Sequence, residues 1–184
     1  MNSKKINICV FCGSMKGNNS IYCSEAKKLG SIISKNKWNL IFGGGKNGLM
    51  GSVAEGFDSS KADIISVIPK NLNDKEVLFP SPNKKILVKN LFFRKEKMIA
   101  LADFIIVLPG GIGTLDELLD VLSLNNLSKK AKKLIVLNIN QYWDPLRDLI
   151  YHLNNNQFIY DIKKSHFNFI DTVDKTVKFI KNNL

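Results

Sequence analysis

Two patterns of apolar and polar positions alternate along the chain. Short runs rich in Ile, Val and Phe are separated by longer segments in which apolar residues recur every three or four positions. The first pattern predicts buried β-strands and the second predicts amphipathic helices. The expected strands span residues 6–12, 38–42, 63–68, 85–89, 103–108 and 134–138. The expected helices span residues 20–36, 48–60, 91–101, 114–127, 142–155 and 172–182.

This alternation is typical of βαβ units, which place their strands side by side in a parallel sheet. We therefore predict an α/β fold: a single doubly wound, Rossmann-like domain over residues 1–184, with a mainly parallel sheet flanked by helices. With 184 residues, 45% of them hydrophobic, the chain can bury one substantial core, and nothing in it suggests a second.

Residues 69–85 fit neither pattern. The segment contains three prolines and has no clear period. It is too long for an ordinary connection between neighbouring elements. We therefore expect it to form a flap over an active site.

Three loops with glycine or turn residues follow expected strands, at residues 12–19, 43–51 and 109–117. Ligands of doubly wound sheets bind beyond the carboxyl ends of the strands, so all three loops should meet at one edge. A single glycine-rich loop is a weak signal, because glycine also serves ordinary turns. Three such loops favour a binding site.

The third loop, PGGIGTLDE, leads directly from a strand into a helix. Its glycines, Gly110, Gly111 and Gly113, let the backbone approach an anion closely. A helix beginning near Thr114 would offer free N–H groups and the positive end of its dipole, which together predict a phosphate site. The structural alternative is a capping box, in which Thr114 caps the helix and exchanges hydrogen bonds with Glu117.

The second loop contains Gly44, Gly45 and a lysine, but it lacks the G-K-[ST] order of a P-loop. The chain also has no clean G-x-G-x-x-G followed by an acidic residue about 20 positions later. Both standard nucleotide-binding motifs are therefore disfavoured.

Glu117 lies on an unexpected face of the helix at 114–127. The main apolar stripe of that helix consists of Leu115, Leu118, Leu119 and Leu122. Glu117 falls with Val121 and Leu124 on nearly the opposite side, which a solvated helix would leave polar. We expect that side to be covered by a pocket wall or a second subunit, and a carboxylate placed there favours a functional role.

Arg94 shares a helical face with Leu91, Met98 and Leu101, and a guanidinium on an apolar stripe needs a partner. That partner is either an internal carboxylate, in a structural salt bridge, or an anionic ligand or catalytic carboxylate. The sequence leaves these alternatives open.

The net charge of +11 raises the possibility of nucleic-acid binding. The lysines are scattered, however, and of 27 basic residues only Arg94 and Arg147 are arginine, the residue best suited to reading bases. The charge therefore favours small anions at least as well as polymers. We expect no nucleic-acid partner.

The remaining composition favours a cytoplasmic protein without metal or membrane segment. The three cysteines argue against a disulfide framework, and Cys9 and Cys12 should face opposite sides of a strand, so their C-x-x-C spacing does not predict a shared metal. The two histidines have no acidic or cysteine cluster beside them. No apolar run approaches the roughly 20 residues of a membrane span.

Four motifs together resemble those of the LOG family, the cytokinin-activating phosphoribohydrolases often mislabelled as lysine decarboxylases. They are CGS at 12–14, GGGKNGLMG at 43–51, RKEKM at 94–98 and PGGIGTLDE at 109–117. The resemblance extends over about residues 6–140, and the R-K-x-x-M and P-G-G-x-G-T-x-x-E motifs are specific to the family.

The resemblance implies hydrolysis of the N-glycosidic bond of AMP or N6-modified cytokinin nucleotides by a homodimer, without a metal or other cofactor. Arg94 and Glu117 would form the catalytic pair. The residues expected to bind substrate are Ser14, Gly44, Gly45, Glu76, Lys95, Gly110, Gly111, Gly113, Thr114 and Ser123.

Two departures from the family pattern leave the base-binding side open. Residues 124–128 read LNNLS where the family has WAQLG, and residues 91–95 read LFFRK where it has M-H-x-R-K. Two other classes remain as alternatives: a non-catalytic carrier of a phosphorylated cofactor, and a Rossmann-like protein that binds single-stranded DNA.

Overall fold

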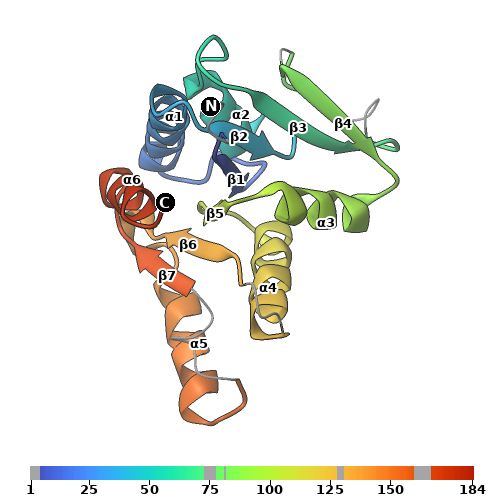
Figure 1. Ribbon diagram of the computed structural model, residues 1–184. Helices are drawn as coiled ribbons and strands as arrows, with labels where there is room; N and C mark the ends of the chain where they lie inside the picture. Colours follow the sequence, from blue (N-terminus) through green and yellow to red (C-terminus); the bar gives the residue numbers. More distant parts are fainter. Residues whose placement is uncertain (1–4, 73–77, 81, 128–130, 160–166) are drawn as a thin grey trace.

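The computed structural model describes residues 5–72, 78–80, 82–127, 131–159 and 167–184 (Figure 1). One parallel sheet has the strand order β4-β3-β2-β1-β5-β6-β7. Its strands are β1 (Asn7–Phe11), β2 (Asn39–Phe42), β3 (Ile64–Pro69), β4 (Lys84–Val88), β5 (Phe104–Val107), β6 (Lys133–Leu137) and β7 (Phe167–Ile170). The helices are α1 (Ser20–Lys35), α2 (Gly48–Gly56), α3 (Leu91–Leu101), α4 (Ile112–Leu127), α5 (Asp144–Asn155) and α6 (Val173–Lys181), with a 3₁₀ turn, η1 (Ile139–Gln141). The predicted α/β Rossmann-like fold is confirmed.

Helices cover both faces of the sheet. The core on one face joins alternate strand residues to α1, α2 and α6, and the core on the other joins the remaining strand residues to α3, α4 and α5 (Figure 1). This arrangement explains why the central strands are continuously apolar rather than alternating. Cys9 belongs to one core and Cys12 to the other, so they do lie on opposite faces.

Three features of the fold differ from the sequence prediction. The strand β7 was not expected, because it lies at the sheet edge, is only half-buried and has Asn168 in its middle. The helix α2 ends at Gly56 instead of residue 60, because the Asp58 side chain accepts hydrogen bonds from the backbone and hydroxyl of Ser60 and closes a turn there. The helix α4 begins at Ile112, two residues earlier than expected.

Strand order reverses between β1 and β5, and this reversal determines where a ligand can bind. The strand β1 pairs with β2 on one side and with β5 on the other. The chain leaves β1 toward α1 on one face and leaves β5 toward α4 on the other face, so the loops after these strands diverge. The backbone N–H of Gly13 donates to the carbonyl of Pro109 at 3.0 Å and joins the bases of the two loops.

None of the helices in the described ranges combines the length and the apolar character needed to cross a bilayer.

Candidate active site

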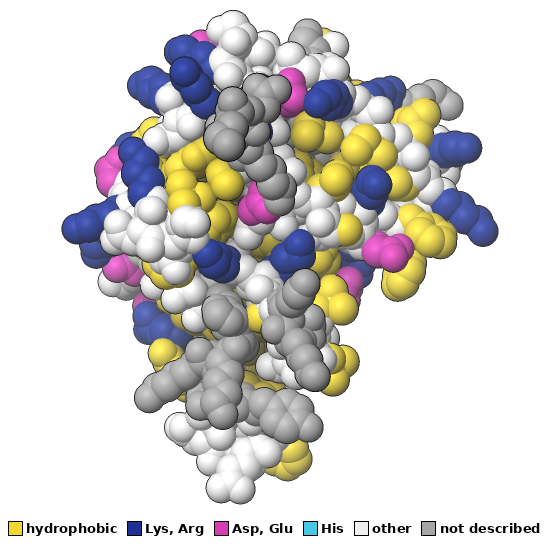
Figure 2. All heavy atoms as spheres, in the orientation of Figure 1, with side chains coloured by type: hydrophobic (Ala, Val, Ile, Leu, Met, Phe, Trp, Pro, Cys, Tyr) yellow, Lys and Arg dark blue, Asp and Glu magenta, His cyan; other side chains and the backbone are white. Residues whose placement is uncertain are grey.

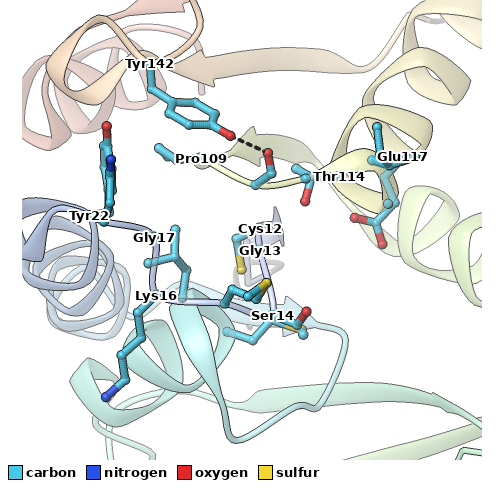
Figure 3. A pocket seen from close by; sticks show the side chains of 18 of the residues that line it. Cys12, Gly13, Ser14, Lys16, Gly17, Tyr22, Pro109, Thr114, Glu117 and Tyr142 are labelled. Atoms are coloured by element: carbon cyan, nitrogen blue, oxygen red, sulfur yellow. Dashed lines mark hydrogen bonds between the residues drawn. The ribbon is translucent and has the colours of Figure 1, made fainter.

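A cavity of about 700 Å³ opens at this reversal (Figure 3). One wall is the loop after β1, from Cys12 to Asn18, and the opposite wall is the loop after β5 with the first turn of α4, from Pro109 to Thr114. The other lining side chains come from several elements: Tyr22, Leu49, Met50, Leu72, Leu91, Arg94, Glu117 and Tyr142. Residues far apart in the sequence therefore meet at the carboxyl edge of the sheet.

The glycine loop supplies backbone donors to this cavity. The N–H of Leu115 donates to the carbonyl of Gly111 at 3.0 Å, so the preceding N–H groups of the first turn have no acceptor within the helix. A side chain at position 110 would lie 2.1 Å from the Thr114 hydroxyl oxygen and 2.8 Å from the Gly13 nitrogen, so only glycine fits there. Free N–H groups at a helix N-terminus can bind an anion.

The capping-box alternative is wrong. Thr114 is the third residue of α4 rather than its N-cap, and its side chain is buried against Gly110. The Glu117 carboxylate accepts a hydrogen bond from Arg94 on α3 instead.

Arg94 and Glu117 form a buried ion pair beside the glycine loop. Nη2 of Arg94 lies 3.1 Å from Oε1 of Glu117, and the two side chains are 13% and 9% exposed. Arg94 thus forms an internal salt bridge, which was one of its two expected roles. Its partner in that bridge is the carboxylate proposed to be catalytic, which was part of the other.

The environment of Glu117 raises the pKa of its carboxyl above the ordinary value. Burial raises the pKa of the Glu117 carboxyl, and the positive charge and hydrogen bond of Arg94 oppose that effect without cancelling it. A carboxyl with a raised pKa in a cavity, held by a specific cation, is typical of an acid, base or electrostatic catalyst.

Glu117 lies on the core-facing side of α4, contrary to the predicted helical wheel. The buried residues of the helix are Thr114, Glu117, Leu118, Val121, Leu122 and Asn125. Leu119, which was expected in the core stripe, is 48% exposed. The face of α4 that packs against the rest of the protein is therefore not the face with the most leucines. Glu117 lies on the packed face and is covered by α3 and the sheet.

Gly43 makes room for the guanidinium. A Cβ at this position would lie 3.0 Å from Nη2 of Arg94 and 3.2 Å from its Cζ. Gly44 and Gly45 were expected in the site and Gly43 was not, although the run of three glycines after a strand was the available signal.

The structure brings only part of the predicted substrate set to the cavity. Ser14, Gly110, Gly111, Gly113 and Thr114 line it. Gly44 and Gly45 do not line it, and instead pair with the segment 78–79, where the Gly44 carbonyl accepts from the N–H of Phe79. Ser123 is exposed on α4 and also outside the cavity lining, and Glu76 lies outside the described residues. The roles of all these residues stay predictions.

Lys95 joins α3 to α4 beside the cavity. Its Nζ lies 2.7 Å from Oδ2 of Asp116 and 2.6 Å from Oδ2 of Asp120. Burial lowers the pKa of Lys95, but its hydrogen bonds to the two aspartates outweigh burial and leave that pKa raised. Lys95 therefore contacts two aspartates of α4 and is not among the residues that line the cavity.

Several lining residues were not expected from the sequence, notably Tyr22 and Tyr142. Tyr142 follows the 3₁₀ turn η1, and its hydroxyl donates to the carbonyl of Gly110 at 2.7 Å (Figure 3). The two tyrosine rings meet edge to face, with centroids 5.6 Å apart. No local pattern marks either residue, because the contact is made across 32 residues of sequence.

Cys12 lines the cavity as a thiol rather than a thiolate. Burial raises the pKa of the Cys12 thiol far above its ordinary value, helped by the negative charge of Glu117, so Cys12 stays protonated. Among the residues that the structure describes, no three His, Cys, Asp or Glu side chains come together as a metal site would require.

The fold and the cavity define a Rossmann-like protein whose glycine loop and buried carboxylate meet at the topological switch point. Residues 50–180 match the family described as "Possible lysine decarboxylase". The chain belongs to this family, which is the LOG family indicated by its motifs.

Curated relatives agree with this placement. The chain is similar to the cytokinin riboside 5′-monophosphate phosphoribohydrolase LOG of Oryza sativa subsp. japonica, with 38% identity over 143 residues, or 78% of this chain and 59% of that protein. It is also similar to a cytokinin riboside 5′-monophosphate phosphoribohydrolase of Arabidopsis thaliana, with 36% identity over 80% of this chain and 70% of that protein. The chain thus spans about three fifths of the length of the rice relative.

Solved structures share the fold. The Moco carrier protein from Chlamydomonas reinhardtii superposes with a TM-score of 0.75 at 17% identity, over 97% of both chains. The molybdenum cofactor binding protein from Rippkaea orientalis gives 0.72 at 20% identity, over 98% of both chains. The DNA processing protein A from Helicobacter pylori gives 0.58 at 14% identity, over 97% of this chain and 81% of that one. At these identities the likeness shows the fold alone.

Proposed function

We propose that the protein hydrolyses the N-glycosidic bond of purine nucleoside 5′-monophosphates, with AMP and N6-modified cytokinin nucleotides as the substrate class. One observation carries this proposal: the buried Arg94–Glu117 pair lines the same cavity as the glycine loop. A phosphate site and a carboxylate in one cavity suit a sugar phosphate. The names of the curated relatives support the same reaction.

The glycine loop would bind the 5′-phosphate. Backbone N–H groups around Gly111 and Gly113, together with the dipole of α4, attract a phosphate and cannot be titrated. Binding energy from this remote group would hold the ribose in place for reaction. A nucleoside without the phosphate should therefore be a poor substrate.

Glu117 would act on the sugar. When the C1′–N9 bond breaks, the ribose develops positive charge, which a nearby carboxylate stabilises. The same carboxylate can orient water toward C1′; the oxygen of that water bonds to C1′, and the proton it loses ends on the departing base. The products are the free purine and ribose 5-phosphate. Arg94 would keep Glu117 ionised and correctly placed.

Incubation of the purified protein with AMP and with N6-isopentenyl-AMP tests this function directly. Free base should appear by chromatography, and adenosine should release much less adenine than AMP under the same conditions. If neither nucleotide yields free base, the proposed reaction is wrong. Tight binding of an unchanged nucleotide would then favour the carrier alternative.

We also propose that the working form is a cytoplasmic homodimer. Large apolar side chains are exposed on α3, at Phe92 and Phe93, and on α4, at Leu119 and Leu124. Figure 2 shows apolar side chains at the surface between charged ones. Exposed apolar side chains on two adjacent helices support a subunit interface.

We expect the net charge of +11 to attract small anionic substrates rather than a nucleic acid. The proposed chemistry requires no cofactor. An electrophoretic shift of an oligonucleotide at about 50 mM salt would contradict the first of these expectations.

A further inference from the structure

Tyr142 contacts the glycine loop at the peptide that joins Gly110 to Gly111. Its hydroxyl donates to the carbonyl of Gly110 at 2.7 Å, as the dashed line in Figure 3 shows. Tyr142 lies between η1 and α5, in a segment separate from the glycine loop. A residue outside the loop motif therefore sets the orientation of one of its peptides.

Successive carbonyl groups of the loop are each held by a donor. The carbonyl of Pro109 accepts from the Gly13 N–H, that of Gly110 from Tyr142, and that of Gly111 from the Leu115 N–H. In a planar trans peptide the N–H points opposite to the C=O. Fixing the Gly110 carbonyl therefore also fixes the direction of the Gly111 N–H, away from the tyrosine.

Tyr142 is itself held in place by an unusual local structure. Asn140 and Gln141 have φ of 52° and 59°, a left-handed conformation that persists only where the surroundings determine it. The side chain of Asn138 accepts from the backbone N–H of Trp143 at 2.7 Å, and the Tyr142 and Trp143 rings meet edge to face at 4.9 Å. These contacts bring the hydroxyl to the loop.

We propose that Tyr142 is a positioning residue of the phosphate site, which holds the Gly110–Gly111 peptide so that the Gly111 N–H is directed at the phosphate of a bound sugar phosphate. The inference deepens the proposed function, because it concerns the phosphate end of the same cavity. It depends on phosphate binding and not on turnover.

Tyr142→Phe tests the proposal, because it removes the hydroxyl and leaves the ring contacts with Tyr22 and Trp143. Tyr151→Phe is the matched control, on the exposed surface of α5 outside the cavity lining. Calorimetric titration with ribose 5-phosphate should give a Kd about five to ten times higher for Tyr142→Phe than for wild type, the effect of losing one neutral hydrogen bond. The control should bind like wild type.

Two further readouts separate positioning from a general loss of structure. With AMP, KM should rise about fivefold while kcat changes less than about twofold, because the phosphate is gripped equally in the ground and transition states. In spectra of unliganded protein labelled with ¹⁵N-glycine, the Gly111 amide should shift in Tyr142→Phe, whereas the Gly43 amide should not.

The outcomes distinguish this inference from the proposed reaction. Wild-type affinity for ribose 5-phosphate in Tyr142→Phe, or an unmoved Gly111 amide, would overturn the role of Tyr142. A wild-type protein that binds ribose 5-phosphate but releases no base from a nucleotide would overturn the proposed reaction and leave the role of Tyr142 standing. A wild-type protein that binds no sugar phosphate would overturn both.

Discussion

The buried pair of Arg94 and Glu117 should be sensitive to the removal of either partner. Each side chain has left bulk water, so removal of one partner leaves an uncompensated charge beside the cavity. A neutral isostere that keeps the shape and the hydrogen-bonding capacity is therefore the informative change, because it tests the charge rather than the packing.

Glu117→Gln should lower kcat for AMP by about a hundredfold or more, because the amide cannot stabilise positive charge on the ribose. The KM for AMP should change little, since the substitution leaves the proposed phosphate site at the glycine loop unchanged. Glu96→Gln, on the exposed face of α3, is the control and should behave as wild type. A Glu117→Gln enzyme with the wild-type rate would remove this carboxylate from the mechanism.

The raised pKa of Glu117 predicts the direction in which activity changes with pH. The proposed mechanism uses the carboxylate form, so kcat/KM should fall as pH drops through that pKa, at a midpoint above the ordinary glutamate value of 4.5. Arg94 lowers this pKa, so Arg94→Gln should move the midpoint to higher pH. Profiles of kcat/KM measured from about pH 4 to 9 test this. A midpoint that stays in place or moves to lower pH in the variant would contradict it.

Gly43→Ala should disturb the pair without touching the substrate. The new Cβ would lie 3.0 Å from Nη2 of Arg94 and displace the guanidinium by a few tenths of an ångström. We expect a loss of about tenfold in kcat/KM for AMP, since small misplacements near the reacting atoms are costly. In an Arg94→Gln background the same change should cost nothing more. Additive losses in that double variant would show that Gly43 acts by another route.

At the level of elements, the site depends on how α3 and α4 are held together. Adjacent residues of α3 both contact α4, Arg94 through Glu117 inside the cavity and Lys95 through Asp116 and Asp120 outside it. The second contact fixes the spacing and rotation of the helices, on which the first one depends.

Lys95→Met should therefore act on kcat and stability more than on KM. It removes both aspartate contacts, so the melting temperature should fall by a few degrees and kcat for AMP by about threefold to tenfold. Lys97→Met, on the exposed surface of α3, serves as the control. A large rise in KM with unchanged kcat would assign Lys95 to substrate binding instead, as the family resemblance implies.

The whole molecule presents apolar helix surface that a single copy does not cover. Phe92 on α3 is 66% exposed and Leu119 on α4 is 48% exposed. The two helices are neighbours, joined by the ion pair of Lys95 and Asp116. Burying such side chains between two copies would stabilise a dimer through the hydrophobic effect.

The double variant Phe92→Asp, Leu119→Asp should be monomeric. Light scattering at micromolar concentration should give the mass of one chain for this variant and of two chains for wild type. Leu149→Asp, at an equally exposed leucine on α5, should leave the mass unchanged. A monomeric wild-type protein would contradict the proposed dimer.

The sequence by itself determined the α/β class, twelve of the elements to within a few residues and the two main loops of the cavity. These properties are local: periodicity follows from which faces an element buries, and glycine after a strand marks a close approach of the backbone. Arg94 and Glu117 were also singled out from their positions on helical faces, and the contact between them was among the alternatives that the sequence left open.

Only the tertiary structure decided which residues face one another. The rotation of α4 is set by its packing on the sheet and α3, so a wheel drawn from leucines alone placed Leu119 inside and Glu117 opposite the core. The half-buried edge strand β7 had too weak a pattern to be seen. The Tyr142 contact with Gly110 spans 32 residues, and it exists because parallel strands bring the loops that follow them to one edge of the sheet.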